Sequence, residues 1–390
     1  MFVEAGGDEI ILCESVVSYR KLDFHKRSYA VSYNILVLNL GGTSTKVSIY
    51  KDDQHVATKS ILHSPEEMDA NPLSKDQVEY RKKLVVEFMS ENGYSVDDLD
   101  AIAMRWPPLN VKKGGTYLVE GKCRDIIMAN YFPDERPIHG SRVVLPMVDS
   151  MLGDRKIPLY LVDPDITDEF SEIAHVSGLP DYPRKPSIHY LNHKAVARKY
   201  AADIGKKYND LRLIICHLGG GIDIGAHEYG IAVDANEGFS GDGPFSSDRA
   251  GTVSSGVMLN ICFDKGLSRK EAFKMVRGSG AGIKGHLGTD DLREVEKRIA
   301  DGDKKAKLIF DALAYQIAKE IGRCYAVLRG KVDAILFTGG IAYSHAMISA
   351  ITEYVGDFAP IAVYPGEMEQ EALALGAYRV LVGAEEPIIM

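Results

Sequence analysis

The sequence predicts an α/β protein made of two similar halves, each with a mixed sheet and covering helices. Three observations support this prediction. A strand–turn–strand pattern occurs twice, a further apolar strand follows each copy, and helical patterns separate the strands. The chain has 390 residues, 45% of them hydrophobic and 26% charged. This length suits two domains, and this composition is typical of a folded globular protein.

The repeated unit is a hairpin with a glycine-rich bend. The sequences ILVLNLGGTSTKVSIY at 35–50 and LRLIICHLGGGIDIGAH at 211–227 each contain an apolar strand, an LGG bend and a second strand. A short strand that opens with Asp-Ala-Ile follows each copy, at Asp100 and at Asp333. The longer second interval indicates an insertion in the second half. Helices are expected from periodic apolar patterns at 77–91, 192–207, 292–300 and 304–329.

Domain boundaries follow from this repeat. The proline-rich stretch at 179–186 is the best candidate for the crossover, which places an N-terminal domain at 34–186 and a C-terminal nucleotide-binding domain at 187–390. Residues 1–33 lie outside the repeat. They form an added edge element, a flexible arm or an artefact of start-site choice, and we assign them no function.

Charge and cysteine content exclude several classes of protein. The net charge of −9 gives no support for general binding to nucleic acid or to anionic membranes. No apolar run reaches the ~18 to 20 residues of a membrane span, and the first residues are acidic, so a cytoplasmic protein is expected. The five cysteines are scattered without a CxxC pair, which indicates reduced thiols, with Cys216 packed in a core strand.

Three glycine bends suggest a phosphate-binding function. They are NLGGTSTK at 39–46, HLGGGIDIG at 217–225 and FTGGIAYS at 337–344. Such bends expose backbone N–H groups and hydroxyls to phosphate oxygens, although a hairpin that needs glycine is the better explanation for a single bend. Three at strand ends of a duplicated chain favour a nucleotide site. None matches the P-loop or the Rossmann pattern.

These motifs resemble the acetate/butyrate kinase family, within the actin/Hsp70/hexokinase superfamily, with this chain as a divergent member. NLGGTSTK, the run from His217 to Thr252, GGTYLV at 114–119, the VDP at 162–164 and YPGEMEQEALALGAYRVL at 364–381 carry the similarity, which extends over about 34–382. The resemblance implies duplicated actin-like ATPase (RNase H-like) domains with an interdomain cleft. It also implies that the last helix packs back on the N-terminal domain.

The resemblance further implies a reversible transfer of the γ-phosphoryl group of ATP to a short-chain carboxylate such as butyrate. ATP/ADP and Mg²⁺ would be the cofactors, and a short-chain fatty acid the substrate. A homodimer or higher homo-oligomer is implied as well. A carboxylate is already ionised at pH 7, so the reaction needs positioning and charge neutralisation and no general base.

The family's functional residues map onto specific positions of this sequence. The resemblance implies that Arg105 holds the substrate carboxylate, that Arg249 neutralises the phosphoryl oxygens and that His189 hydrogen-bonds them. Asp163 is implied in catalysis and, with Glu371, in magnesium binding, although Glu367 and Glu369 stand nearby. The implied phosphate and nucleotide contacts are Asn39, Thr43, Ser44, Lys46, Gly219, Gly220, Gly221, Gly339, Gly340 and Ile341.

Each of these positions also has a simpler interpretation. Arg105 could be a solvated arginine at a strand end, and Asp163 before proline could cap a turn. His189 and His193 have the i, i+4 spacing of metal ligands, but a tyrosine stands where a zinc protease would have glutamate. The acidic run at 165–172 reads as a solvated helix start.

Some positions depart from the family pattern. Trp106-Pro107-Pro108 follows Arg105, so Trp106 either walls the acyl pocket or belongs to a loop that withdraws Arg105 from a substrate. Gly42 replaces a serine. Asp223 replaces a common serine and adds negative charge near the phosphates, unless Mg²⁺ or Arg249 offsets it. Two alternatives therefore stand beside the carboxylate kinase: a nucleotide-binding paralogue with lost or altered activity, and a hydroxyl-substrate kinase of the same fold with Asp163 as base.

Overall fold

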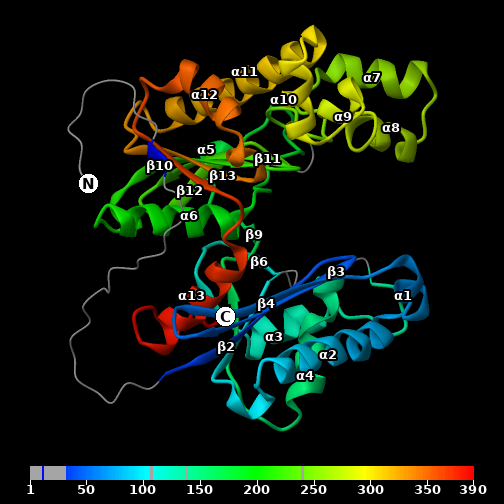
Figure 1. Cartoon of the computed structure of the whole chain (residues 1–390), viewed down its shortest axis with the longest axis vertical. Helices are drawn as coiled ribbons and strands as arrows, with labels where there is room; N and C mark the ends of the chain where they lie inside the picture. Colours follow the sequence, from blue (N-terminus) through cyan, green and yellow to red (C-terminus); the bar gives the residue numbers. More distant parts are fainter. Residues whose placement is uncertain (1–10, 13–31, 106–108, 138, 239–240) are drawn as a thin grey trace. The chain divides into compact units, whose positions relative to one another are not determined.

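The computed structural model of the chain describes residues 11–12, 32–105, 109–137, 139–238 and 241–390, which form two compact units (Figure 1). The first unit contains the described part of 32–168 together with Met368–Met390. The second contains 11–12 and the described part of Glu169–Glu367. The chain thus enters the second unit at Glu169, before the crossover expected at 179–186.

The first unit is built on a six-stranded mixed sheet with the order β4-β3-β2-β5-β8-β7. β2 pairs antiparallel with β3, and β3 with β4, whereas β5 runs parallel to β2 and β8 parallel to β5. These strands are β2 (Asn34–Leu40), β3 (Ser44–Lys51), β4 (Gln54–Leu62), β5 (Ala101–Met104), β7 (Thr116–Leu118) and β8 (Leu159–Val162). Two short strands, β6 (Asn110–Val111) and β9 (Ile166–Thr167), pair with each other in a separate sheet.

Helices cover both faces of this sheet because its central strands are apolar on both sides. Leu36, Leu38 and Leu40 of β2 belong to the core that α2 and α4 complete. Ile35 and Val37 are also fully buried, and side chains alternate along a strand, so they point to the opposite face, where α13 packs against β2, β5 and β8. The helices are α1 (Pro65–Ala70), α2 (Ser74–Glu91), α3 (Gly121–Met128), α4 (Val144–Leu152) and α13 (Glu369–Leu381).

The second unit has a sheet of the same design, with the order β1-β14-β13-β10-β11-β12. β10 and β11 form an antiparallel hairpin, and β13 and β14 follow in parallel on the other side of β10. Part of the N-terminal extension adds a parallel edge strand, β1, next to β14. The strands are β1 (Ile11–Leu12), β10 (Arg212–Leu218), β11 (Ile222–Glu228), β12 (Ile231–Ala235), β13 (Ala334–Gly339) and β14 (Ile361–Pro365).

Figure 1 shows α11 and α12 on one side of this sheet and α6 on the other. The core joins Leu313, Ile317 and Ile321 of α11 to Ile214 and Cys216 of β10. The prediction that Cys216 packs in a core strand is thereby confirmed. The helices are α5 (Glu172–His175), α6 (Tyr190–Asp203), α7 (Ser255–Asp264), α8 (Arg269–Val276), α9 (Gly282–Leu287), α10 (Leu292–Ala300), α11 (Lys304–Val327) and α12 (His345–Val355).

The predicted duplication is confirmed. In each unit, an antiparallel hairpin with a glycine bend is joined by a third, parallel strand: β2, β3 and β5 in the first unit, and β10, β11 and β13 in the second. α7 to α10, together with the irregular segments around them, account for the insertion expected in the second half. Among the described residues, no helix combines the length and apolar character needed to cross a lipid bilayer.

Candidate active site

The bend between β2 and β3 carries the first set of predicted phosphate contacts. The N–H of Gly41 donates to the carbonyl of Ser44 at 2.9 Å and closes the bend. Asn39 and Lys46 face each other across the hairpin just below it, and Thr43 at the tip is exposed. The structure therefore brings these four predicted residues together at one end of one hairpin.

A buried arginine holds the backbone of this bend in place. The Nη1 of Arg81 donates to the Ser44 carbonyl (2.7 Å) and to Thr45 Oγ1 (2.9 Å), and Nη2 donates to the Gly42 carbonyl (3.1 Å). Burial lowers the pKa of Arg81 to about 10, so the guanidinium stays charged at neutral pH. Sequence reasoning missed this residue because an arginine in a helix pattern reads as solvated.

Arg105 follows β5 and is held by two carboxylates. Its Nη1 contacts Glu369 Oε2, and its Nε lies 3.3 Å from Asp165 Oδ2. Asn39 Nδ2 donates to the same Glu369 oxygen at 2.9 Å. The Arg105 side chain is 11% exposed, which excludes the simpler interpretation of a solvated arginine.

The glutamate beside Arg105 is Glu369, two positions before Glu371, the residue that the resemblance implies in magnesium binding. Both lie in the first turn of α13, but residues two apart on a helix project about 200° from each other. Glu369 is buried next to Arg105, while the charge of Glu371 adds to the effect of burial in raising the pKa of Tyr50. The sequence offers three glutamates within five positions, and only the helix phase distinguishes them.

Asp163 directly follows β8, and Arg105 directly follows the neighbouring strand β5. Because β5 and β8 are parallel, both residues follow the carboxyl ends of adjacent strands. Asp163 is 1% exposed and has a φ of 40°, in the left-handed region that costs energy for residues other than glycine. Such strain is concentrated at functional sites, so the backbone here supports a functional role for the carboxylate.

In the second unit, the bend between β10 and β11 brings three predicted residues together. A Cβ atom on Gly221 would lie 2.3 Å from Arg249 Nη1 and 3.2 Å from His189 Cε1. Only glycine therefore allows both side chains to approach this backbone. Gly219 N–H donates to the Gly221 carbonyl at 3.0 Å, and Ser246 Oγ donates to the Gly220 carbonyl at 2.6 Å, so the bend is fixed from both sides.

Arg249 is a largely buried cation at this bend. Its Nη1 donates to the carbonyl of Gly238 at 2.7 Å, and its side chain is 12% exposed. Burial and the charge of Arg277 lower the pKa of Arg249, while Asp248 and Asp223 act in the opposite direction. An arginine keeps its charge at neutral pH despite such effects, so the bend presents a fixed positive charge.

Asp223 is completely buried, and two histidines hold its carboxylate. Oδ2 lies 2.5 Å from His189 Nδ1, and Oδ1 lies 2.8 Å from His193 Nε2. The carboxylate whose charge we expected Mg²⁺ or Arg249 to offset is thus held directly by two imidazoles, while its charge also acts on Arg249. The i, i+4 spacing of the histidines directs both to one carboxylate. Among the described residues, no group of three or more histidine, cysteine or acidic side chains forms a metal site.

The third bend follows β13, the strand next to β10, so these two bends follow the carboxyl ends of adjacent parallel strands. Gly339 has a φ of 87° and exchanges backbone hydrogen bonds with Gly366 at 2.9 and 3.0 Å. Gly340 and Ile341 open the short helix that follows, and Ile341 is buried. The structure thus places both glycine sets of the second unit at one edge of its sheet.

Two further expectations have clear outcomes. The interpretation of 165–172 as a solvated helix start holds only at its end, where the exposed Glu172 opens α5. The acidic residues before it are paired. Asp165 and Asp168 pair with Arg105 and Lys112, and Glu169 is buried against Lys194. The predicted pocket wall, Trp106, and the two prolines after it lie outside the described residues.

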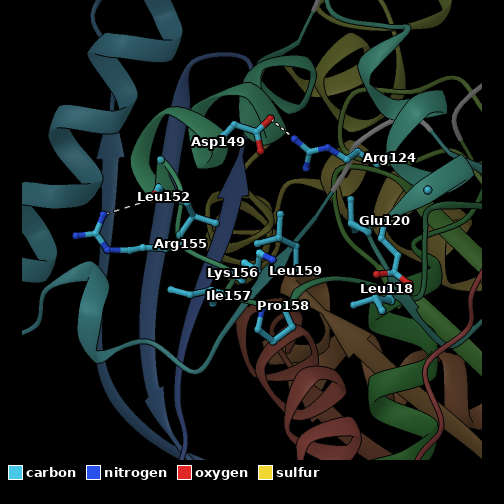
Figure 2. A pocket seen from close by; sticks show the side chains of 13 residues that line it. Leu118, Glu120, Arg124, Asp149, Leu152, Arg155, Lys156, Ile157, Pro158 and Leu159 are labelled. Atoms are coloured by element: carbon cyan, nitrogen blue, oxygen red, sulfur yellow. Dashed lines mark hydrogen bonds and ion pairs between the residues drawn. The ribbon is translucent and has the colours of Figure 1, made fainter.

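A separate hollow of about 550 Å³ lies in the first unit, at the end of β8 opposite to Asp163 (Figure 2). Figure 2 shows an apolar floor that includes Leu159, with Arg124 paired to Asp149 at the rim. None of the predicted site residues lines it. The hollow is therefore distinct from the candidate active site.

Known proteins are similar to this chain over most of its length. Residues 182–359 match the acetokinase family. A probable butyrate kinase from Clostridium botulinum is 40% identical over 358 residues, which cover 91% of this chain and 99% of that protein. The chain belongs to the acetokinase family. Butyrate kinase 1 from Clostridium acetobutylicum is 39% identical over 354 residues, covering 91% of this chain and 98% of that enzyme.

Solved structures of acetokinase relatives show the same fold. Acetate kinase from Porphyromonas gingivalis has a TM-score of 0.71 at 18% identity, over 90% of this chain and 100% of that one. A propionate kinase from Francisella tularensis has a TM-score of 0.68 at 19% identity, over 88% of this chain and 98% of that one. The predicted fold class, duplicated α/β domains with mixed sheets, is confirmed.

Proposed function

We propose that this chain transfers the γ-phosphoryl group of ATP to a short-chain carboxylate such as butyrate, reversibly, giving an acyl phosphate and ADP. The observation that supports this most strongly is the burial and fixed position of two arginines. Arg105 and Arg249 are both largely buried, and each is held rigidly at a strand end or a glycine bend. Buried, fixed guanidinium groups suit the recognition of carboxylate and phosphoryl oxygens.

In the first unit, Arg105 would orient the substrate carboxylate. Asp165 and Glu369 hold the guanidinium in one orientation, so little side-chain freedom is lost when an acid binds. The substrate oxygen is already anionic at neutral pH, so attack on phosphorus requires no proton transfer. The neighbouring bend, with Asn39, Thr43, Ser44 and Lys46, would hold the phosphate oxygens through hydroxyl, amide and ammonium donors.

In the second unit, Arg249 and His189 would neutralise charge on the transferring phosphoryl group. Both side chains lie against Gly221, so their donors are close to one point of the bend. Backbone N–H groups of Gly220 and Gly221 would add further donors next to Gly219, whose own N–H closes the bend, while Gly339, Gly340 and Ile341 would shape the adenosine pocket. In-line transfer joins the substrate carboxylate and the γ-phosphoryl group. The proposal therefore requires the residues of both units to act on the same phosphoryl group.

The acidic residues of the first unit fit a magnesium ion. Mg²⁺ in kinases is held by one or two carboxylates together with substrate phosphates, so a complete cage of protein ligands is not needed. The buried carboxylate of Asp163 would be one ligand, and Glu369 or Glu371 a second. When bound, the ion would supply charge neutralisation to the phosphate oxygens.

A hydroxamate assay tests this proposal. The protein is incubated with MgATP, hydroxylamine and each linear acid from acetate to hexanoate, with branched acids included. We expect hydroxamate to form with at least one C3 to C5 acid, because only acyl phosphates react in this way. Nucleotide binding without hydroxamate from any acid would contradict the proposal and favour a non-catalytic paralogue. Phosphorylated product that resists hydroxylamine would indicate a hydroxyl substrate.

We also propose a homo-oligomer. α7 and α8 contain no buried residue, and their exposed apolar side chains include Val257, Leu259, Phe263 and Phe273. A second copy of the chain would cover such a surface. Sedimentation of the purified protein tests this, and a monomer at micromolar concentration would contradict it. The buried thiols and the use of ATP also support a cytoplasmic location.

A further inference from the structure

A continuous chain of polar side chains leads from His189 into the interior of the second unit. His189 contacts Asp223, which contacts His193. His193 Nδ1 lies 3.1 Å from His227 Nε2, and His227 Nδ1 lies 2.7 Å from the hydroxyl of Tyr208. Apart from His189, the members of this chain are almost completely buried. Buried polar groups cost stability unless they are paired, and apolar side chains would fill the same space without that cost. We therefore looked for a role of these residues other than packing.

Asp223 is the anionic centre of this chain. Its Oδ1 also accepts a hydrogen bond from the backbone N–H of His189 at 3.0 Å, so the carboxylate holds both the backbone and the ring of that residue. Burial alone would raise the pKa of Asp223, but the charges and hydrogen bonds of His189 and His193 hold it well below its ordinary value. The carboxylate is therefore ionised at neutral pH.

An ionised carboxylate at Nδ1 determines what the rest of the His189 ring can do. Nδ1 must carry a proton to donate to Asp223, so in the proposed reaction Nε2 would be the nitrogen that meets a phosphoryl oxygen. The negative charge also favours a second proton on the ring, and this would make Nε2–H a donor to phosphoryl oxygens. Without the carboxylate, neutral His189 could present Nε2 as an acceptor, which would repel those oxygens.

The other groups around His189 act in both directions. Arg249 approaches it across Gly221 and disfavours a positive ring. His217 stacks on it with ring centroids 3.8 Å apart, and Glu367 lies 3.8 Å from His217 Nε2. Asp223 lies at hydrogen-bond distance from the ring, 2.5 Å from Nδ1, so its charge opposes that of Arg249 directly.

The last histidine of this hydrogen-bonded series, His227, is uncharged. Burial, followed by the charges of His193 and Lys194, keeps the pKa of His227 well below its ordinary value. His227 is therefore neutral at pH 7, and it can pass one hydrogen bond on to or from Tyr208.

We propose that Asp223 is a positioning residue for the transfer reaction, which fixes the His189 ring and keeps it doubly protonated so that Nε2–H donates to the transferring phosphoryl group. This inference rests on the proposed function, because it gives His189 its partner in that reaction. It also explains why an acidic residue stands at the start of β11, directly after a bend where extra negative charge would oppose phosphate binding. The charge is directed at two histidines, and its effect on the phosphates is reversed through His189.

The test combines a direct titration with kinetics. Nitrogen-15 NMR of histidine-labelled protein, with His189 assigned through His189→Gln, reports the protonation of each ring nitrogen. In the wild type, we expect His189 to stay doubly protonated above pH ~6.5, where an ordinary histidine is half titrated. In Asp223→Asn, which keeps the shape, we expect it to lose that proton at lower pH.

Kinetics should follow the same pattern. At pH 8, we expect Asp223→Asn to lower kcat by roughly 10- to 100-fold, in the range for proton-dependent assistance, with less loss at pH 6. KM for ATP and for the acid should change by less than about 3-fold, because the interaction belongs to the transition state. Tyr208→Phe is the matched control: it also removes a buried polar group from the chain, but leaves every contact of Asp223 in place.

The outcomes separate this inference from the proposed function. An unchanged His189 titration in Asp223→Asn would overturn the positioning role, whatever the activity. Should that variant fail to fold, a wild-type His189 that titrates at or below pH ~6.5 would overturn it equally. An equal pH-dependent loss of kcat in Tyr208→Phe would indicate a structural role only. If the NMR result is as expected and no acid is phosphorylated, the proposed reaction fails while the Asp223–His189 pairing stands.

Discussion

At the scale of single residues, the candidate site depends on how closely side chains approach the backbone. Gly221 shows this most directly, because Arg249 Nη1 lies 2.3 Å from where its Cβ would stand. A methyl group there would force Arg249 away from the bend. Charge-stabilising groups of this kind contribute several kcal/mol to a transition state, so we expect Gly221→Ala to lower kcat by at least about 100-fold, as Arg249→Ala would.

Steady-state kinetics of both variants checks this expectation. Gly322→Ala is the control, since a Cβ at Gly322 on α11 meets no atom within 4 Å, and we expect unchanged kinetics there. Near-normal kcat in Gly221→Ala would show that Arg249 does not need its present position. Additive losses in the double variant Gly221→Ala/Arg249→Ala would likewise show that the two changes do not act through one interaction.

The residues of the site could be predicted only in part. Motif matches identified the glycine bends, Arg105 and Arg249, because those side chains stand in distinctive local sequence. The choice of Glu369 required the phase of α13, and the role of Asp165 required the position of Arg105. Contacts between residues far apart in sequence leave no local pattern, which is why Asp223 appeared as an unpaired charge before its two histidines were located.

At the scale of elements, the β2–β3 hairpin depends on a helix that packs against it. Arg81 on α2 donates to the Gly42 and Ser44 carbonyls and to Thr45 Oγ1. Arg81→Met would keep most of the side-chain volume and remove all three hydrogen bonds, while the Ser44 carbonyl and Thr45 Oγ1 would keep Gly41 and His63 as partners. Since a hydrogen bond from a charged group contributes about 1.5 to 3 kcal/mol, we expect the free energy of unfolding to fall by about 2 to 4 kcal/mol.

Urea unfolding measures that loss, and KM for ATP reports the bend separately. We expect KM to rise in Arg81→Met because the bend loses its support. Lys83→Met on the same helix, whose side chain is exposed, is the control. If Arg81→Met were as stable as Lys83→Met, the hairpin would not depend on the guanidinium.

His63 links the same hairpin to pH. Its Nε2 lies 3.0 Å from Thr45 Oγ1 and its Nδ1 3.1 Å from the Tyr80 hydroxyl. Burial, with a contribution from Arg81, lowers the pKa of His63 to about 4. The unfolded chain takes up this proton near pH ~6.5, so stability should be lost as pH falls from about 6.5 to 4.

Urea unfolding at pH 7, 6, 5 and 4 checks this expectation. We expect His63→Gln, which keeps hydrogen-bonding groups but does not titrate, to show a smaller loss over this range than the wild type. His55→Gln, on the exposed strand β4, provides the control for general acid effects. Parallel losses in the wild type and His63→Gln would show that other groups cause the acid sensitivity.

At the scale of the whole molecule, the duplication was predictable and the division into units was less so. Both LGG hairpins are local features, and local patterns of apolar residues and glycine determine hairpins directly. The boundary at Asp168 and Glu169 lies within an acidic run without glycine or proline, so no local signal indicates it. Here the carboxylates of Asp168 and Glu169 pair with Lys112 and Lys194, each within its own unit, and only the folded chain supplies those partners.

The site residues are divided between the two units. The proposed function therefore predicts that a variant in one unit can lose the binding of one substrate and keep the binding of the other. Arg105 belongs to the first unit and Arg249 to the second. Trp106, the only tryptophan, is adjacent to Arg105 in sequence, so its fluorescence reports on the predicted carboxylate site. We expect butyrate to change this fluorescence in Arg249→Ala and to have no effect in Arg105→Gln.

Nucleotide binding, measured by calorimetry with MgADP, should show the reverse pattern. We expect Arg105→Gln to keep it within about 3-fold of the wild type, since that arginine would not touch the nucleotide, while both variants lose phosphoryl transfer. The double variant should be no less active than the more impaired single variant, because residues that act on one transition state are not additive. Loss of nucleotide affinity in Arg105→Gln, or a butyrate response that depends on Arg249, would show that neither unit binds its ligand independently.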